Sequence, residues 1–271
     1  MPVLYHSERQ PPENYNLAVC LLASGSKGNS IYVSNGTTAL LIDAGLSGIE
    51  IERRLQSKNL SPENLDAILV SHEHGDHIQG VGVLSRRYRL PVYMNPKTSK
   101  ASQTQIGKVS NLKMFECGRP FQIKSLTIHP FSISHDASDP AGFTIHHNGS
   151  KIGIATDLGM VTAMVKEHLK DCHLMILEAN HDPAMLIEGP YPWPIKQRIK
   201  SRSGHLSNEE SKALLDEIKH PKLECVILAH LSETNNTLQK ALGTFDKTVR
   251  DEAPRIAVAC QEACGEIFYL K

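Results

Sequence analysis

The sequence predicts a single α/β domain built in layers, with two β-sheets packed face to face between outer helices. Apolar runs of strand length open each half of the 271-residue chain, and strand-like runs then alternate with helical segments. The sequence has no linker rich in glycine or serine, no low-complexity block and no repeat of fixed period. We therefore expect one domain over residues 17–271, preceded by a flexible N-terminal tail over residues 1–16.

The first half begins with apolar runs that tight turns join into consecutive strands, at 17–23, 30–34 and 38–43. Ser47 and Glu50 then have the spacing of a capping box, which predicts the start of a helix. A short turn follows at residues 61–63, because proline suits the first helical position. The apolar run 66–71 is the next expected strand, and it ends abruptly at the polar segment 71–77.

The second half repeats this alternation. A helix is expected at 161–170, and the apolar runs 173–178 and 223–230, each followed by a helix, are expected to be central strands. The remaining expected strands are 126–134, 142–147, 151–156, 255–260 and 265–270.

Composition limits the class of protein. The residues are 40% hydrophobic, which is enough for a substantial core, and the formal net charge is zero. Zero net charge argues against a generally basic nucleic-acid coat protein but allows a local basic patch. No apolar run approaches the roughly 20 residues that span a bilayer. The N-terminus lacks the basic region and apolar block of a signal peptide, so we expect a cytoplasmic protein with no membrane partner.

The six cysteines form no C-x-x-C pair. Cys20, Cys172, Cys225 and Cys260 lie in or beside apolar runs, where free thiols usually pack as small hydrophobic groups. We therefore expect these four to be buried and reduced rather than disulfide-bonded or metal-binding.

Polar side chains recur at the carboxyl ends of the predicted strands, which is where open α/β sheets bind ligands. Most of them are of types that bind metals. In chain order they are Asp43, His72, His74, Asp76, His77, His135, Asp157, Glu178 and His230. The recurrence at successive strand ends predicts that these side chains converge on one site.

The segment 71–77 carries the densest group, His72-x-His74-x-Asp76-His77. In an extended segment, the alternation of a strand directs His72 and His74 to the same side. Asp76 and His77 then lie at the start of the next helix and face another direction, a geometry that suits two metals side by side. Neutral imidazole and carboxylate suit zinc, manganese or iron. The alternative is an ordinary polar loop, and the matching residues at the other strand ends argue against it.

With H-x-H-x-D-H after a strand, then a lone histidine, an aspartate and a final histidine, the sequence resembles the metallo-β-lactamase superfamily over about residues 17–235. The resemblance implies a four-layer αββα sandwich with two divalent ions per chain, zinc or manganese before iron. It implies a first ion on His72, His74 and His135. It implies a second ion on Asp76, His77 and His230, with Asp157 bridging the two. It also implies that Asp43 braces the histidine loop from behind.

Longer stretches are similar to the YycJ/WalJ branch of this superfamily, whose members are exonucleases. These stretches include 23–30, 133–143, 189–199 and 228–236. The similarity implies a hydrolase that cleaves phosphodiester bonds in nucleic acid, foremost a DNA exonuclease that uses a metal-bridging hydroxide. Its implied catalytic residues are Asp76, Glu178 and His205.

The leaving oxygen of such a reaction needs a proton. In ribonuclease Z relatives, H-E-A-T and G-H-S-T motifs place a glutamate and a histidine for this step. Here Glu178 in LEAN and His205 in GHLS occupy similar positions. We expect His205 to deliver the proton and Glu178 to orient it. The alternative is that His205 only braces the following helix, although Ser207 and Glu210 already form a complete capping box for it.

The stretch 189–208 combines Trp193 and three prolines with four evenly spaced cations, Lys196, Arg198, Lys200 and Arg202. On a helix these cations would spread around the axis, whereas in an extended segment they would share one side. Trp193 either packs beneath the loop, which we favour, or stacks on a base. The candidates for substrate contact are Lys27, Asn29, His181, Lys196 and Arg198.

Two other functions remain open. One is hydrolysis of a small phosphodiester or a thioester, because glyoxalase II shares all seven ligands; four cations suit phosphate better than a small neutral thioester. The other is a non-catalytic scaffold that metals only stabilise. Structural metal sites are normally closed by protein ligands, and seven ligands for two metals leave room for water, which favours catalysis. The sequence carries no signal for the oligomeric state.

Overall fold

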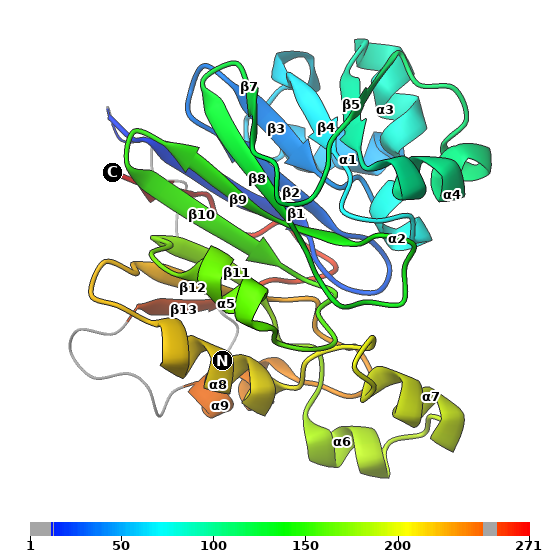
Figure 1. Ribbon diagram of the computed structural model, residues 1–271, viewed down its shortest axis with the longest axis vertical. Helices are drawn as coiled ribbons and strands as arrows, with labels where there is room; N and C mark the ends of the chain where they lie inside the picture. Colours follow the sequence, from blue (N-terminus) through cyan, green and yellow to red (C-terminus); the bar gives the residue numbers. More distant parts are fainter. Residues whose placement is uncertain (1–11, 13, 246–253) are drawn as a thin grey trace.

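Two seven-stranded sheets face each other, and helices cover the outer side of each sheet (Figure 1). This computed structural model describes residues 12, 14–245 and 254–271. The arrangement confirms the predicted single-domain αββα sandwich. The predicted N-terminal tail lies mostly outside the described residues, so its flexibility stays a prediction.

The first sheet has the strand order β14-β1-β2-β3-β4-β5-β6. Strands β14 to β3 pair antiparallel, and β3 to β6 pair parallel. The strands are β1 (Leu17–Ala23), β2 (Ser30–Ser34), β3 (Ala39–Ile42), β4 (Ala67–Leu69), β5 (Pro91–Met94), β6 (Asn111–Met114) and β14 (Phe268–Leu270). The helical segments of this half are α1 (Gly48–Gln56), the 3₁₀ turn η1 (Pro62–Asn64), α2 (Gly75–Ile78), α3 (Val81–Tyr88) and α4 (Pro96–Ile106).

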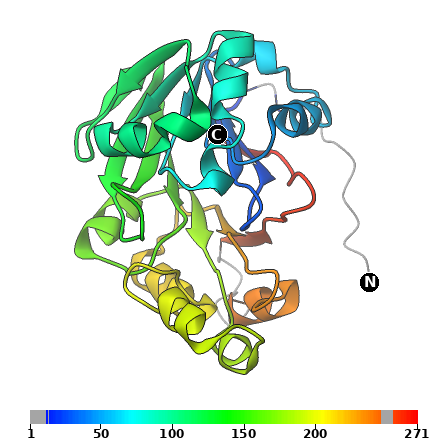
Figure 2. The same cartoon turned by 90° about the vertical axis from the view of Figure 1, so that its right-hand side faces the viewer.

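The second sheet has the order β13-β12-β11-β10-β9-β8-β7, antiparallel from β7 to β10 and parallel from β10 to β13. Its strands are β7 (Phe121–Ile123), β8 (Leu126–Ser132), β9 (Ala141–His147), β10 (Ser150–Ala155), β11 (Leu174–Glu178), β12 (Cys225–Ala229) and β13 (Arg255–Val258). The helices are α5 (Ala163–Leu169), α6 (Pro183–Glu188), α7 (Trp193–Ile199), α8 (Asn208–Ile218) and α9 (Leu238–Phe245). Figure 2 shows α6, α7 and α8 gathered at the end opposite α1, α3 and α4.

The main core lies between the two sheets. On β1, Val19 and Leu21 point into this core, while Cys20 and Leu22 pack under the outer helices. Strands buried on both faces read as continuous apolar runs, which is why β1 and β2 begin and end where the sequence predicts them.

The helix starts follow two different patterns. The Ser207 side chain accepts from the Glu210 amide and the Glu210 carboxylate accepts from the Ser207 amide, so the predicted capping box of α8 is confirmed. At α1, Ser47 accepts from the Glu50 amide, but the Glu50 carboxylate turns to Arg53 and Arg54. Only half of that predicted box forms, because two guanidinium groups compete for the carboxylate.

Of the four thiols predicted to be buried, those of Cys20, Cys172 and Cys225 are free and buried. Burial raises the pKa of each of these thiols to about 12 and keeps them protonated. The prediction is wrong for Cys260, which is exposed because β13 ends before it. None of the described helices has the length and apolar character of a membrane span.

Candidate metal centre

The predicted ligands lie together at the carboxyl ends of strands from both sheets. His72 and His74 follow β4, and Asp76 and His77 lie in the first turn of α2. His135, Asp157 and His230 lie just beyond β8, β10 and β12. The parallel strands of both sheets end at this edge, so residues that are far apart in sequence meet in one buried cluster.

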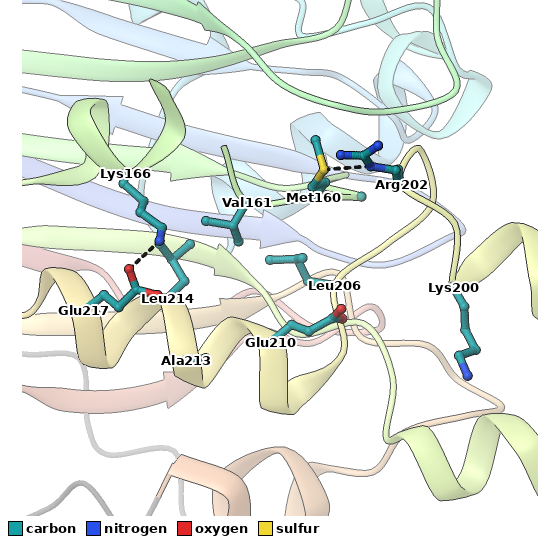
Figure 3. Close-up of a pocket in the computed structure, with 11 residues that line it drawn as sticks. Met160, Val161, Lys166, Lys200, Arg202, Leu206, Glu210, Ala213, Leu214 and Glu217 are labelled. Atoms are coloured by element: carbon teal, nitrogen blue, oxygen red, sulfur yellow. Dashed lines mark hydrogen bonds and ion pairs between the residues drawn. The ribbon is translucent and has the colours of Figure 1, made fainter. Parts of the chain in front are cut away.

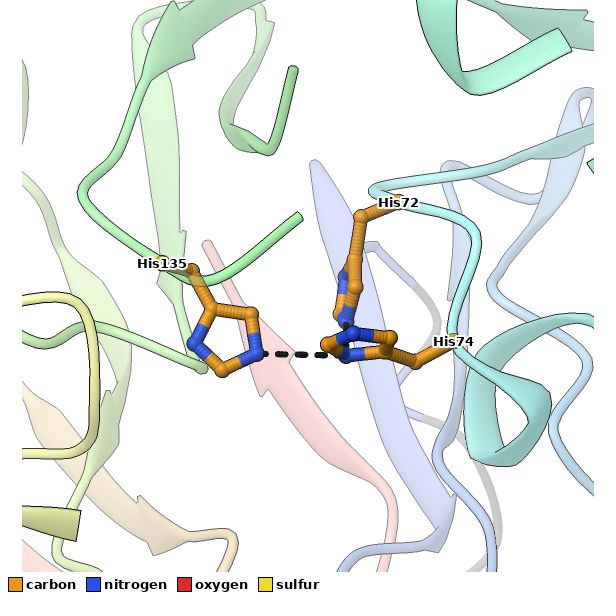
Figure 4. Close-up of side chains that lie close together, drawn as sticks. All are labelled: His72, His74 and His135. Atoms are coloured by element: carbon orange, nitrogen blue, oxygen red, sulfur yellow. Dashed lines mark hydrogen bonds between the residues drawn. The ribbon is translucent and has the colours of Figure 1, made fainter. Parts of the chain in front are cut away.

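His72, His74 and His135 form the first group of donor atoms (Figure 4). Nε2 of His72 lies 3.0 Å from Nδ1 of His74, which lies 3.3 Å from Nε2 of His135. The outer nitrogens are engaged elsewhere: Nδ1 of His72 meets the Ser71 hydroxyl at 2.9 Å, and Nδ1 of His135 meets the Gly204 carbonyl at 3.2 Å. If both Nδ1 atoms carry the proton, as these partners favour, the Nε2 lone pairs face inward.

Burial favours the neutral form of two members of the first group, His72 and His135. Burial lowers the pKa of His72 well below its usual value, and burial also lowers the pKa of His135. A neutral imidazole is the form that binds a metal cation.

Asp76, His77 and His230 form the second group. Oδ2 of Asp76 lies 3.6 Å from Nε2 of His77 and 3.8 Å from Nε2 of His230. Each ring donates from Nδ1 to a buried carboxylate, His77 to Asp43 at 2.8 Å and His230 to Glu178 at 2.9 Å. These carboxylates fix both ring orientations and leave the two Nε2 atoms facing Asp76.

Asp157 lies between the two groups and is almost completely buried. Its Oδ2 is 3.2 Å from Nε2 of His77, and its Oδ1 is 3.7 Å from Nε2 of His135. Burial alone would raise the pKa of Asp157, but His230 and His77 hold it well below its usual value. Burial alone would likewise lower the pKa of His230, but Asp157 and further carboxylates raise it to about 10. Asp157 is thus an anion at the centre of the cluster.

The residues present fit two divalent ions. Among the described residues, Oδ2 of Asp157 and Nε2 of His230 are buried without a hydrogen-bond partner. Buried polar atoms are normally satisfied, so inward-facing orphaned atoms indicate a missing partner. The donor set of imidazoles and carboxylates suits a divalent transition metal. The buried His and Asp clusters are therefore consistent with a dinuclear metal site.

Asp43 holds the histidine loop from behind. Its Oδ1 accepts from the Ser71 amide at 2.8 Å, and its Oδ2 accepts from the Ser71 hydroxyl at 2.7 Å and from His77. The backbone of Asp43 is left-handed, with φ 59°, and so are those of Asp157 (56°) and His230 (57°). Asp, Asn and His adopt this conformation more readily than other side chains.

Glu178 joins the second group to His205. Its side chain is fully buried, and Oε1 accepts from Nδ1 of His230 and from Nδ1 of His205, the latter at 2.8 Å. Oε2 accepts from the Leu158 amide at 2.6 Å. The His205 ring lies 5.1 Å from the rings of both His135 and His230, and 20% of its side chain is exposed. Since Nδ1 is engaged, Nε2 is the atom that remains for a substrate.

Two of the predicted substrate contacts in the first half of the chain have other partners. Asn29 is buried, and its Nδ2 lies 3.2 Å from Oδ2 of Asp76 and 3.0 Å from Nε2 of His77. It holds the loop that carries the candidate ligands, and a contact between Asn29 and a substrate stays a prediction. Lys27 is exposed but forms ion pairs with Glu233 at 2.7 Å and Glu262 at 3.5 Å.

The predicted contacts in the second half also differ from expectation. His181 is buried beneath the α8 start, with 2% of the residue exposed. Lys196 is buried and donates from Nζ to the Ile187 carbonyl at 2.6 Å, so it is not available to a substrate. Arg198 donates from Nε to Asp136 at 2.6 Å.

The basic stretch is helical at its start, so its four cations do not share one side. α7 contains Lys196 and Arg198, while Lys200 and Arg202 follow its end. The expectation that Trp193 packs beneath the loop is wrong, because 59% of this residue is exposed. Trp193 is the first residue of the short surface helix α7, and most of its side chain does not pack against other residues.

Sequence reasoning missed Ser71 and Asp136 as supports of the site, and it gave Asn29 a different role, that of a substrate contact. Ser71 directly precedes the histidine motif, and its position is the signal that could have identified it. Asn29 and Asp136 were harder to find, because Asn29 reaches Asp76 and Asp136 links Arg198 to His135 only in three dimensions.

These features match a known family. Residues 38–230 match the beta-lactamase superfamily domain, which is well over half of the chain. The chain belongs to the metallo-β-lactamase superfamily. Among its curated superfamily relatives, exodeoxyribonuclease YycJ of Bacillus anthracis is 40% identical over 234 residues, which is 86% of this chain and 89% of that protein. Exodeoxyribonuclease WalJ of Streptococcus pneumoniae is 40% identical over 225 residues, covering 82% and 84%.

Solved structures of the superfamily show the same architecture. The metallo-beta-lactamase fold protein YhfI from Bacillus subtilis superposes with a TM-score of 0.72 at 19% identity, covering 93% of this chain and 99% of that one. At this identity the likeness supports the fold alone. The resemblance that the sequence motifs predict is therefore confirmed at the level of fold and family.

Proposed function

We propose that this chain is a binuclear metal-dependent exodeoxyribonuclease. The observation that carries the proposal is the pair of donor groups on either side of Asp157, in a chain 40% identical to exodeoxyribonucleases over most of its length. His72, His74 and His135 would hold one ion. Asp76, His77 and His230 would hold the other, with Asp157 between them.

Two divalent ions in these positions would supply a water that is ionised near neutral pH and would stabilise negative charge developing on the phosphate. The protein's own contribution is to fix the orientation of the metal-binding side chains. Asp43 and Glu178 fix the rings of His77 and His230 through Nδ1, and such outer partners keep ligand geometry and basicity constant. We propose zinc or manganese as the ions, with iron as the alternative, and imidazole and carboxylate donors suit all three.

His205 is the proposed proton donor for the leaving oxygen. Glu178 accepts its Nδ1 proton, so the proton to be delivered is the one on Nε2. Burial alone would lower the pKa of His205, but Glu178 raises it and so favours the protonated form that a general acid needs. The complete capping box of α8 supports this role, because the helix start does not depend on His205.

A cytoplasmic location belongs to the same proposal. The buried thiols of Cys20, Cys172 and Cys225 are free, as in proteins of reducing compartments, and DNA is available there.

The test is a nuclease panel. Protein loaded with manganese or zinc is incubated with single- and double-stranded DNA and RNA labelled at either end, with His72→Ala as the control. We expect mononucleotide release from one end of DNA, lost in His72→Ala. Cleavage of RNA alone, or only of a p-nitrophenyl phosphodiester or a thioester, would replace the proposed substrate. No hydrolysis of any of these would support a non-catalytic scaffold.

A further inference from the structure

We propose that a hollow beside the metal centre binds one nucleotide of the substrate strand next to the cleaved bond, with Lys200 and Arg202 holding its phosphate. The inference rests on the proposed nuclease function and adds a second contact to it. The hollow has a volume of about 290 Å³ and lies between the loop after β10 and the helix α8 (Figure 3).

The hollow and the metal centre share one wall. Asp157 belongs to the metal centre, and Gly159, two residues later, lines the hollow. On the facing segment, His205 bonds to Glu178 while the adjacent Leu206 lines the hollow. A substrate strand held at the ions would therefore have the hollow as its neighbouring surface.

Close backbone packing fixes that wall in place. The Gly159 amide donates to the Ser134 carbonyl at 2.7 Å, and the Ser134 hydroxyl donates to the Arg202 carbonyl at 2.6 Å. A Cβ atom on Gly159 would lie 2.5 Å from the Arg202 carbonyl oxygen, so glycine is needed for this approach. Arg202 is thus held by its backbone at a defined distance from the loop that carries Asp157.

Some of the charged side chains around the hollow already have a protein partner, and others do not. Lys166 forms an ion pair with Glu217, and the Glu210 carboxylate caps α8 through the Ser207 amide at 2.9 Å. Lys200 and Arg202 are exposed, and neither has a carboxylate partner among the described residues. Two cations without an ion-pair partner among the described residues therefore border the hollow, where Lys166 and Glu217 neutralise each other and Glu210 is held at the start of α8.

Arg202 is also preoriented. Its Nε donates to the Met160 thioether at 3.1 Å, and Figure 3 shows the guanidinium lying beside Met160 at the edge of the hollow. A thioether is a weak acceptor and leaves the charge of the guanidinium free. A planar guanidinium in this state suits bidentate binding of a phosphate.

The floor of the hollow is apolar, with Met160, Val161, Leu206 and Leu214. Cations at one edge and an apolar floor match the two parts of a nucleotide, a phosphate and a base with its sugar. The volume is near the lower end of small-molecule pockets, roughly 300–1,000 Å³, so it suits one nucleotide.

The experiment compares a long and a minimal substrate. Steady-state kinetics are measured on a 12-nucleotide single-stranded DNA and on thymidine 5′-(p-nitrophenyl phosphate), which is too short to reach both the ions and the hollow. For K200A/R202A we expect KM for the DNA to rise about tenfold. The slope of log(kcat/KM) against log(salt) should become shallower by about 0.7, since single strands lose about 0.7 per phosphate contact and the two cations hold one phosphate. Turnover of the minimal substrate should not change.

Two further variants make the result specific. K108A/K113A removes two exposed cations, one just after α4 and one on β6, in the half of the molecule opposite α8 (Figure 1), and should leave the kinetics on both substrates unchanged. A213W keeps every charge but fills the hollow from the exposed face of α8, and should raise KM for the DNA alone.

The outcomes separate the two proposals. If the wild-type protein cleaves no DNA, the proposed function fails. If it cleaves DNA and either K200A/R202A or A213W keeps KM within twofold, the hollow is not a subsite and the proposed function stands. An equal effect of K108A/K113A would assign the binding to general charge and would also overturn the inference.

Discussion

Asp43 and Glu178 are buried carboxylates at the ends of strands in opposite sheets, and each holds Nδ1 of one histidine of the second donor group. Their other bonds differ. Asp43 also accepts hydrogen bonds from the Ser71 amide and hydroxyl, whereas Glu178 also accepts one from His205. One carboxylate therefore only positions a ligand, and the other positions a ligand and the candidate proton donor together. Removing them should have different consequences for the reaction.

Glu178→Gln should have the largest effect. The Glu178 carboxylate accepts from His205, His230 and the Leu158 amide, and an amide NH₂ in its place would oppose at least one of these donors. We expect kcat on DNA to fall by about 10³- to 10⁵-fold, combining loss of general-acid catalysis and of ligand orientation. Kinetics with metal analysis test this, and activity within tenfold of wild type would show that the carboxylate is dispensable.

His205→Ala isolates the proton-donor half of that effect. We expect kcat on DNA to fall by about 10²- to 10⁴-fold while metal content stays the same, because no donor atom of the two metal groups is removed. A p-nitrophenolate leaves without a proton, so hydrolysis of a p-nitrophenyl phosphodiester should be nearly normal. Equal losses on both substrates would assign His205 a structural role instead.

Asp43→Asn isolates the positioning half. Asparagine tolerates the left-handed backbone at this position but cannot accept from both Ser71 and His77 as the carboxylate does. We expect metal affinity to fall by about 10- to 100-fold, measured by competition with a chelator. With saturating metal, the ratio of activity on DNA to activity on the p-nitrophenyl ester should match wild type, unlike that of His205→Ala.

Glu50→Gln is the matched control, because Glu50 orients a cation outside the site. It holds Arg54, whose buried guanidinium donates to the Leu22 carbonyl at 2.7 Å. Hydrogen bonds from Arg53 and from Arg54 lower the pKa of Glu50 to about 2. The pKa of Glu50 is lower in the folded state than in the unfolded state. The bonds between Glu50 and the two arginines therefore stabilise the fold fully above about pH 4.5, and this stability is lost as pH falls towards 2.

We expect Glu50→Gln to lower the free energy of unfolding by about 1 kcal/mol at pH 7 and to leave both activities unchanged. Denaturant unfolding from pH 7 to pH 2 checks this, since the variant should lose stability less steeply below pH 4.5. A change in kcat would mean that carboxylates outside the site also tune the reaction.

The two halves of the site also differ in how far the sequence predicts them. His72 to His77 form one contiguous motif, and the fold brings the single residues His135, Asp157 and His230 to it because parallel strands end at one edge. Strand-end position was a sufficient signal for all of these. No comparable positional signal in the sequence identifies the residues that contact a substrate. Where α7 ends decides these contacts. It places Lys196 against the Ile187 carbonyl and Arg198 against Asp136, whereas Lys200 and Arg202 have no ion-pair partner among the described residues.

The left-handed backbone at Asp43, Asp157 and His230 restricts how this site can evolve. A β-branched or bulky residue at these positions would strain the backbone even where its chemistry could bind a metal. Glycine or asparagine would fit the backbone but would supply neither the carboxylate of Asp43 and Asp157 nor the imidazole of His230. Selection for folding and selection for catalysis therefore accept different residues at the same three positions. An exchange of Asp157 for a β-branched or bulky side chain would require the strand end to be rebuilt at the same time.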